Sequence, residues 1–371
     1  MIIGCTKNLL EFLKVTPTKR EGEIDPLFSW TANLITVNRR KALVAVNDAA
    51  KCCFVLYGLT AKILPKLPEL ILSGIRAVLE SEYIAPEVIE KYLKEAGSDV
   101  VWTPTVRSGI AYCNKACERV KRFSNLLDAD ELIPGRFFPW MNDDMIMKHG
   151  GHTICEILCE VLAERYGSPV QSARMAELEI ELALHTPCKR TLLVPDNFNF
   201  YQLHTVLQTA FAWEDCHLHQ FVLKKNRSEK PEALIRPDYV EMDDLMFVPD
   251  IKRIDSTEIT VKEVFSQYKK IEYEYDFGDE WVHTVKLKRW IENCDSPMPT
   301  CTEAVGETPL ENSGGPSGFQ MKAEILADPE HPDYEDIVMW SGGRCTNPLN
   351  TKAINWELGF RYRHCIPVIY D

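Results

Sequence analysis

The chain has 371 residues, of which 45% are hydrophobic and 26% are charged, and this length predicts two domains rather than one core. Its formal net charge of -13 excludes a general electrostatic attraction to nucleic-acid phosphates or anionic lipid. The apolar stretches are too short to span a bilayer, and the first residues lack the pattern of a signal peptide. We therefore expect a cytoplasmic protein with no membrane partner, whose 13 scattered cysteines are mostly buried thiols.

The first half of the chain predicts an α+β domain over residues 1–145. Short segments with alternating apolar residues are typical of strands, and later segments have the 3.6-residue period of amphipathic helices. Gly97 ends the second of these helices. The expected elements are an opening strand and helical turn within residues 1–13, strands at 30–37, 42–46, 52–57 and 100–104, helices at 67–79 and 86–96, and a strand followed by a helix within 108–123.

Residues 146–175 are expected to form a helix and a linker. Apolar side chains recur at helical spacing from Met145 to Tyr166, and the Gly167-Ser168-Pro169 sequence stops that pattern. The linker is therefore placed at residues 167–174.

Residues 176–371 predict a second α+β domain. The fold class is accordingly α+β, with two tandem domains that each pack helices against a mostly antiparallel sheet. Polar composition predicts an irregular excursion over residues 226–255, and a Pro-, Gly- and Ser-rich stretch predicts a long loop over 294–319. The expected elements are strands at 178–184, 190–194, 217–223, 273–277 and 281–290, and helices at 201–212, 261–265, 322–326, 334–340 and 351–360.

One stretch of the second domain, Tyr273–His283, alternates aromatic residues with carboxylates. It predicts a strand, a tight turn at Asp276–Asp279 and a return strand, and Gly278 can supply the positive φ that such a turn requires. The turn would bring its two aspartates close to the imidazole of His283. The histidines at 217 and 219 would join them if their strand is a neighbour.

Two interpretations of this cluster stay open. Carboxylate and imidazole ligands from Asp276, Asp279 and His283, with Glu311 from a later loop, would suit a divalent metal in a hydrolase or nuclease. Alternatively, the aspartates fix the turn by accepting hydrogen bonds from its backbone, and the histidine is a satisfied core residue. The second interpretation is favoured, so no cofactor is assigned and a divalent metal remains the alternative.

The favoured site is a groove that binds a ligand without catalysis. Trp213 and Trp281 would form its apolar walls, while carboxylates and imidazoles would orient the ligand. The Gly314-Gly315 loop could cradle an anion with its amides, but close packing of its backbone against the aromatic hairpin explains it better. The candidate ligand-binding residues are Trp213, His217, His219, Asp276, Asp279, Trp281, His283, Glu311, Gly314 and Gly315.

A basic turn in the first domain, Arg39-Arg40-Lys41, lies near Trp30 and is the candidate nucleic-acid contact. A short basic run in a hairpin turn is more often solvated, so a protein or small-molecule ligand is favoured over nucleic acid as the partner.

Four motifs of the second half are arranged in the order of a known family. They are Tyr201-Gln202-Leu203-His204 with Ala210-Phe211-Ala212-Trp213, His217-Leu218-His219-Gln220-Phe221, Tyr275–His283, and Gly314-Gly315-Pro316-Ser317-Gly318-Phe319. With them, residues 176–371 resemble the plasmid pRiA4b ORF-3-like family, which implies a compact α+β fold and no established activity. Family members often have Pro-Pro-Glu-Asp before the double glycine, whereas this chain has Pro309-Leu310-Glu311-Asn312 and so lacks one acidic residue there.

The first half also resembles a known group, an uncharacterised bacterial domain family, over about residues 1–140. The resemblance is carried by Met1–Lys7, Trp30–Ile35, Asn38–Lys41 and Leu56–Leu59. The whole chain is therefore interpreted as a bacterial protein of the kind found on plasmids and mobile elements, acting as a binding or interaction module.

Overall fold

The structure is a computed structural model that describes residues 1–19, 22–142, 144–147, 150–225, 230–237 and 251–361. The chain forms two compact units, Met1–Ser172 and Ala173–Asp371. Each unit is a mixed α/β structure with helices packed on a sheet, and antiparallel pairing predominates, as the sequence predicts. Among the described residues, no helix is long and apolar enough to cross a membrane.

The first unit contains a five-stranded sheet with the order β4-β3-β2-β1-β5. The predicted meander forms its antiparallel half, and β1 pairs in parallel with both β2 and β5. The hairpin between β2 and β3 turns on Asn38 and Arg39, both with positive φ, as a two-residue turn requires. The strands are β1 (Ile2–Cys5), β2 (Ser29–Val37), β3 (Arg40–Asn47), β4 (Cys53–Leu59) and β5 (Val101–Pro104), with a separate small pair β6 (Met145–Ile146) and β7 (His152–Thr153).

Helices surround this sheet because each has one apolar face to bury. In α2 the buried residues include Ile71, Ile75 and Val78, which are spaced by three or four positions along the helix. The helices are α1 (Lys7–Leu13), α2 (Leu67–Ser81), α3 (Pro86–Ala96), α4 (Arg107–Arg122), α5 (Phe138–Met141) and α6 (Ile154–Tyr166). Short 3-10 helices lie at Pro26–Phe28, Leu64–Lys66, Ser124–Leu126 and Gly135–Phe137.

Two elements of the first unit differ from the sequence prediction. No strand precedes the helix within residues 107–122, because Cys113, Cys117 and Val120 form a continuous buried helical stripe. The helix expected from residue 145 begins only at Ile154. There the Thr153 hydroxyl accepts a hydrogen bond from the Glu156 amide in a capping box, which fixes the first turn of α6.

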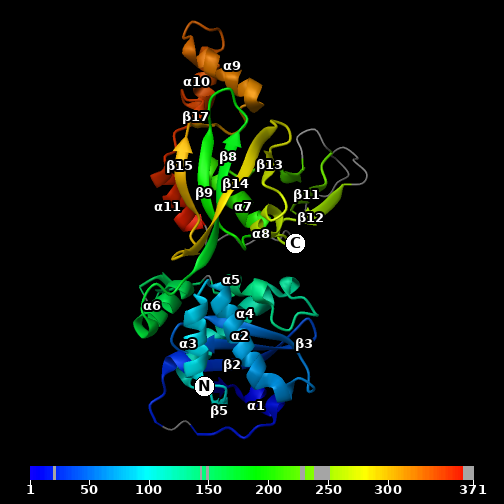
Figure 1. Cartoon of the computed structure of the whole chain (residues 1–371), viewed down its shortest axis with the longest axis vertical. Helices are drawn as coiled ribbons and strands as arrows, with labels where there is room; N and C mark the ends of the chain where they lie inside the picture. Colours follow the sequence, from blue (N-terminus) through cyan, green and yellow to red (C-terminus); the bar gives the residue numbers. More distant parts are fainter. Residues whose placement is uncertain (20–21, 143, 148–149, 226–229, 238–250, 362–371) are drawn as a thin grey trace. The chain divides into compact units, whose positions relative to one another are not determined.

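The second unit contains an eight-stranded sheet with the order β12-β11-β10-β13-β14-β8-β9-β15 (Figure 1). All neighbours are antiparallel except β11 and β12. The long strand β14 joins the aromatic hairpin to β8, and Leu182 on β8 pairs with His283. The strands are β8 (Ala173–Leu182), β9 (Lys189–Pro195), β10 (His219–Leu223), β11 (Ala233–Arg236), β12 (Lys252–Asp255), β13 (Lys270–Tyr275), β14 (Trp281–Cys294) and β15 (Thr300–Val305), with a small pair β16 (Thr308–Pro309) and β17 (Thr346–Asn347).

Apolar packing and the buried guanidinium of Arg190 hold the helices of the second unit against its sheet. Arg190 on β9 has a relative exposure of 0%, and its guanidinium donates to the carbonyl oxygen of Ala210 and to the Thr308 hydroxyl. This side chain connects β9 to the end of α7 and to β16. The helices are α7 (Phe200–Phe211), α8 (Val261–Phe265), α9 (Gly315–Ala327), α10 (Tyr334–Ser341) and α11 (Thr351–Arg361).

Two segments expected to be irregular contain regular structure. Residues 294–319, predicted as one loop, contain β15, β16 and the first turn of α9. The prediction missed the two strands because they pair with β9 and β17, which lie far away in the sequence. Residues 226–255 contain β11 and β12. Residues 226–229 and 238–250 of that excursion, including the apolar segment 245–248, lie outside the described residues.

Candidate functional site

The aromatic hairpin forms as predicted, with its turn held by Asp276. The carboxylate Oδ1 of Asp276 accepts hydrogen bonds from the amides of Gly278 at 3.0 Å and Asp279 at 3.3 Å. The positive φ angles of the turn occur at Asp276 and Glu280, not at Gly278 as expected. An aspartate tolerates this backbone region better than most residues because its short side chain bonds the local backbone.

The double glycine lies against this turn. The Gly314 amide donates to Asp279 Oδ2 at 2.9 Å. A Cβ added to Gly315, whose φ is +69°, would meet the backbone oxygen of Asp279 at 2.3 Å. Close backbone approach therefore explains the glycine, and it fixes the start of α9 on the hairpin.

Replacing Gly315 with alanine is expected to lower the free energy of unfolding by about 2–4 kcal/mol, because the methyl group clashes with backbone in an unfavourable φ region. Gly342→Ala is the control: its φ is also positive, at +63°, but a Cβ there meets nothing within 4 Å. The control is expected to cost about 1 kcal/mol. Urea unfolding of both variants measures the difference, and equal losses would contradict the close-approach explanation.

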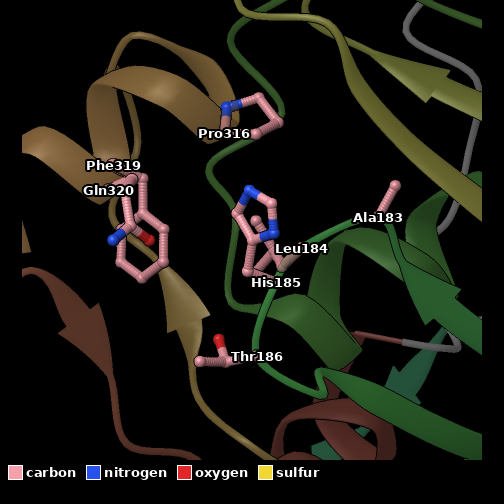
Figure 2. Close-up of a pocket in the computed structure, with 7 residues that line it drawn as sticks. All are labelled: Ala183, Leu184, His185, Thr186, Pro316, Phe319 and Gln320. Atoms are coloured by element: carbon pink, nitrogen blue, oxygen red, sulfur yellow. The ribbon is translucent and has the colours of Figure 1, made fainter.

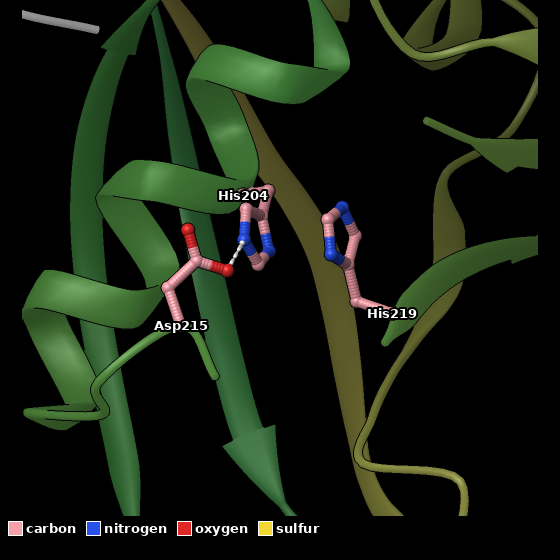
Figure 3. A group of neighbouring side chains, drawn as sticks. All are labelled: His204, Asp215 and His219. Carbon is pink, nitrogen blue, oxygen red and sulfur yellow. Dashed lines mark hydrogen bonds and ion pairs between the residues drawn. The ribbon is translucent and has the colours of Figure 1, made fainter. Parts of the chain in front are cut away.

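His204, Asp215 and His219 form what we call the inner cluster (Figure 3). His204 projects from α7, and its Nε2 lies 2.7 Å from Asp215 Oδ1. Its Nδ1 lies 2.8 Å from the Tyr273 hydroxyl, which also accepts a hydrogen bond from Gln208 at 2.9 Å. A continuous hydrogen-bonded chain therefore runs from a half-exposed carboxylate to a buried phenol.

The His219 ring stacks on His204 with a centroid distance of 3.4 Å and an interplanar angle of 6°. Neither His219 nitrogen has a hydrogen-bond partner among the described residues. Burial, assisted by the neighbouring His204, lowers the pKa of His219 well below its usual value. Parallel stacked rings direct their nitrogen lone pairs along parallel planes, so these two imidazoles do not converge on one metal ion.

Cys216, His217 and Glu311 form a second group, the outer cluster, of which Cys216 and His217 directly follow Asp215 in the chain. Cys216 Sγ donates to Glu311 Oε1 at 3.4 Å, and His217 Nε2 lies 3.9 Å from the same oxygen. His217 Nε2 also lies 3.0 Å from Asn312 Oδ1 and 3.4 Å from Asp276 Oδ2. Cys216 is exposed, so the outer cluster opens to solvent.

Tyr275 supports the outer cluster from the sheet. Its hydroxyl donates a short hydrogen bond to Glu311 Oε1 and accepts one from the Cys216 amide at 3.1 Å. Burial and the bonded Glu311 raise the pKa of Tyr275, and the same two causes raise the pKa of the Cys216 thiol. The other carboxylate oxygen, Glu311 Oε2, is buried and has no hydrogen-bond partner among the described residues.

The predicted tryptophans form an aromatic core behind these clusters. Trp213 stacks on Tyr275 at 4.8 Å and donates from Nε1 to the Pro309 carbonyl at 3.3 Å. Trp281 lies 5.9 Å from Trp213. His283 is fully buried against Trp213, and burial lowers its pKa to about 3. These residues act as packed core and are not exposed walls of a groove.

The candidate residues thus separate into groups. His217, Glu311 and Asp276 meet at the outer cluster, and His219 belongs to the inner cluster. Asp276, Asp279 and His283 do not form one of the metal-compatible groups found among the described residues.

The basic side chains at the β2–β3 turn form hydrogen bonds within the first unit. Arg40 Nη1 donates to the Ala129 carbonyl at 2.9 Å, and Lys41 Nζ donates to the Thr36 hydroxyl at 3.0 Å. Arg39 supplies the second positive φ of the β2–β3 hairpin. These contacts give the turn a structural role.

A small cavity of about 260 Å³ lies between the loop after β8 and the first turns of α9 (Figure 2). Its walls are mainly apolar, and the His185 ring lies in the space between the two segments. The lining residues are Ala183, Leu184, His185, Thr186, Pro316, Phe319 and Gln320.

Both halves of the chain match known families. Residues 174–357 match the model of the plasmid pRiA4b ORF-3-like protein family. The uncharacterized protein y4hQ of Sinorhizobium fredii is 31% identical over 155 residues, which cover 41% of this chain and 73% of that protein. The chain belongs to the plasmid pRiA4b ORF-3-like family.

Two further matches complete this comparison. Residues 2–155 match a domain of unknown function, DUF6933, so both resemblances inferred from the motifs are confirmed. A crystal structure of a protein of unknown function from Methanosarcina mazei Go1 is 27% identical, covers 48% of this chain and 97% of that one, and has a TM-score of 0.41.

Within the plasmid pRiA4b ORF-3-like domain, sequence reasoning missed His204, Asp215, Cys216 and Asn312. His204 and Cys216 carried a signal, since histidine and cysteine are common metal and acid–base groups, and Cys216 directly precedes the predicted His217 strand. Their partners Tyr273 and Glu311 come from distant segments, so their proximity depends on strand order and not on local spacing.

Proposed function

We propose that the plasmid pRiA4b ORF-3-like unit of this chain is a binding module that captures a positively charged group at the outer cluster. The observation that carries this proposal is the buried Glu311 Oε2, which lacks a partner among the described residues. A buried, unpartnered acceptor costs about 1–3 kcal/mol, and more when it is charged, so a ligand that satisfies it gains this energy.

The charge of the surroundings supports a cationic ligand. Asp276 Oδ2 and Asn312 Oδ1 face His217 from the same side as Glu311, so acceptor oxygens dominate. Among the described residues, no lysine or arginine forms an ion pair with Glu311 or Asp276, and Lys322 Nζ donates to the Ser313 carbonyl at 2.8 Å. The outer cluster therefore has more hydrogen-bond acceptors than its own donors can satisfy.

Binding is favoured over catalysis because the aspartates of the turn already accept hydrogen bonds that stabilise the fold. Asp276 Oδ1 bonds two amides of its own turn, and Asp279 Oδ2 bonds the Gly314 amide. The family name refers to a plasmid reading frame, which supports a bacterial module that travels with mobile elements.

The test is titration of the full chain with arginine amide, lysine amide and zinc ion, with acetamide and acetate as uncharged and anionic probes. Tryptophan fluorescence supplies the signal, because Trp213 stacks on the tyrosine that bonds Glu311. We expect at least one cation to saturate the wild type. Glu311→Gln keeps the shape of the side chain but removes its charge, and it should weaken that binding at least about tenfold.

Glu177→Gln is the matched control. Glu177 is also poorly exposed, at 15%, but Arg289 already neutralises it at 2.6 Å on another part of the sheet. This variant is expected to bind like the wild type. The proposal fails if no cation saturates the wild type, or if both glutamine variants lose binding equally.

A further inference from the structure

We infer that the cation captured by the outer cluster is a transition-metal ion of the zinc class, held by Cys216 Sγ, His217 Nε2 and the carboxylate of Glu311, whose Oε2 is unpartnered among the described residues. The inference rests on the proposed function and names its ligand. The three donor atoms come from two segments, one after α7 and one before α9, which the fold brings within 4.8 Å of one another.

The spacing of the donors fits a tetrahedral ion. With metal–ligand distances of about 2.0–2.3 Å, neighbouring donors of a tetrahedral zinc site lie about 3.3–3.8 Å apart. The Cys216 Sγ to Glu311 Oε1 distance is 3.4 Å, and the His217 Nε2 to Glu311 Oε1 distance is 3.9 Å. For these two pairs, side-chain shifts of a few tenths of an ångström reach the spacing of a metal site, and the donor atoms of the third pair, Cys216 and His217, lie within 4.8 Å of each other.

The chemistry of the donors selects the ion. A set of thiolate, imidazole and carboxylate suits zinc, cobalt or iron, whereas magnesium and calcium prefer oxygen alone. An organic ammonium or guanidinium group would gain nothing from the thiol. Asn312 Oδ1 and Asp276 Oδ2, at 3.0 and 3.4 Å from His217 Nε2, supply oxygens for the remaining position, which is otherwise open to water.

Neighbouring groups already orient the ligands. The Tyr275 hydroxyl donates to Glu311 Oε1 and accepts from the Cys216 amide, so a single phenol holds both segments. The His217 ring packs edge-on against Tyr275 at 5.8 Å. Groups that are bonded to metal ligands in this way hold the ligands in the orientation that the metal requires, and their loss typically weakens metal affinity about 10- to 100-fold.

The experiment measures binding of zinc and cobalt ions to the full chain by calorimetry, mass spectrometry and visible absorption. We expect one ion per chain and a thiolate-to-cobalt charge-transfer band. Cys216→Ser should abolish that band, and Cys216→Ser and His217→Gln should each weaken zinc binding by about 100-fold or more. His185→Gln removes a histidine that lines the separate cavity and should bind zinc like the wild type.

The outcomes separate the two proposals. If zinc fails to bind while arginine amide still binds in a Glu311-dependent manner, the metal inference is overturned and the binding module stands. Zinc binding that survives Cys216→Ser with its cobalt spectrum unchanged would also overturn it. Circular dichroism of each variant confirms that lost binding is not lost folding. If no cation binds to the wild type, both the proposed function and the metal inference are overturned.

Discussion

Replacing Arg190 with methionine is expected to lower the free energy of unfolding of the second unit by about 3–5 kcal/mol. The side chain has a relative exposure of 0%, and its nitrogens donate to carbonyl oxygens and to the Thr308 hydroxyl. Removing the guanidinium takes a donor from each of these buried or part-buried acceptors, and the ring of Phe211 loses its cation. The carbonyl acceptors belong to Lys189, Val305, Gly306 and Ala210.

Arg289→Met supplies the matched control, because Arg289 is 68% exposed and, among the described residues, forms an ion pair with Glu177 alone. A surface pair of this kind contributes about 1 kcal/mol or less. Urea unfolding of both variants is the measurement. Arg190→Lys should also lose stability, because an ammonium cannot reproduce the planar fork of donors. Similar losses for Arg190→Met and Arg289→Met would contradict the importance of the buried guanidinium.

Lowering the pH from about 7 to about 4.5 is expected to destabilise the protein in part through His283. Burial lowers the pKa of this side chain from 6.5 to about 3 in the folded state. Between these values the unfolded chain binds a proton that the folded protein excludes. The stability from His283 is therefore present above pH 6.5 and declines toward pH 3, by at most about 1.4 kcal/mol per pH unit.

His283→Leu isolates this contribution, because leucine cannot titrate. The variant should show a flatter dependence of the unfolding free energy on pH, whatever its stability at neutral pH. Val285→Ala is the control: it is a buried residue of the same strand, and its loss lowers stability without changing a titratable group. A His283→Leu curve parallel to those of the wild type and the control would contradict the prediction.

Elements with strong local signals were predictable from the sequence. Helix α3 spans Pro86–Ala96 as expected, because a proline opens its first turn and Gly97 ends it with a positive φ. Helix α8 also has its expected bounds, and a capping box between Thr260 and Glu263 defines its start. The aromatic hairpin followed from alternation and turn chemistry, and its register places Tyr275 opposite Trp281.

The outer cluster could not be predicted in the same way. Glu311 was singled out from its loop, but its partners Tyr275 and Cys216 are 36 and 95 positions away along the chain. Such contacts depend on the order β10-β13-β14 within the sheet, which no local period encodes. The positive φ at Asp276 was missed for a related reason, because the surrounding hydrogen bonds, and not residue propensity, hold that conformation.

The pairing of β8 with β14 has a consequence for how the second unit acquires its structure. Leu182 pairs with His283 roughly 100 residues later in the chain, so pairing of β8 with β14 must close a very long loop. During synthesis the β8–β9 hairpin emerges first, with one edge of β8 exposed until β14 has left the ribosome. Folding of this unit should therefore be slow, and the nascent hairpin is the segment that most needs protection from aggregation.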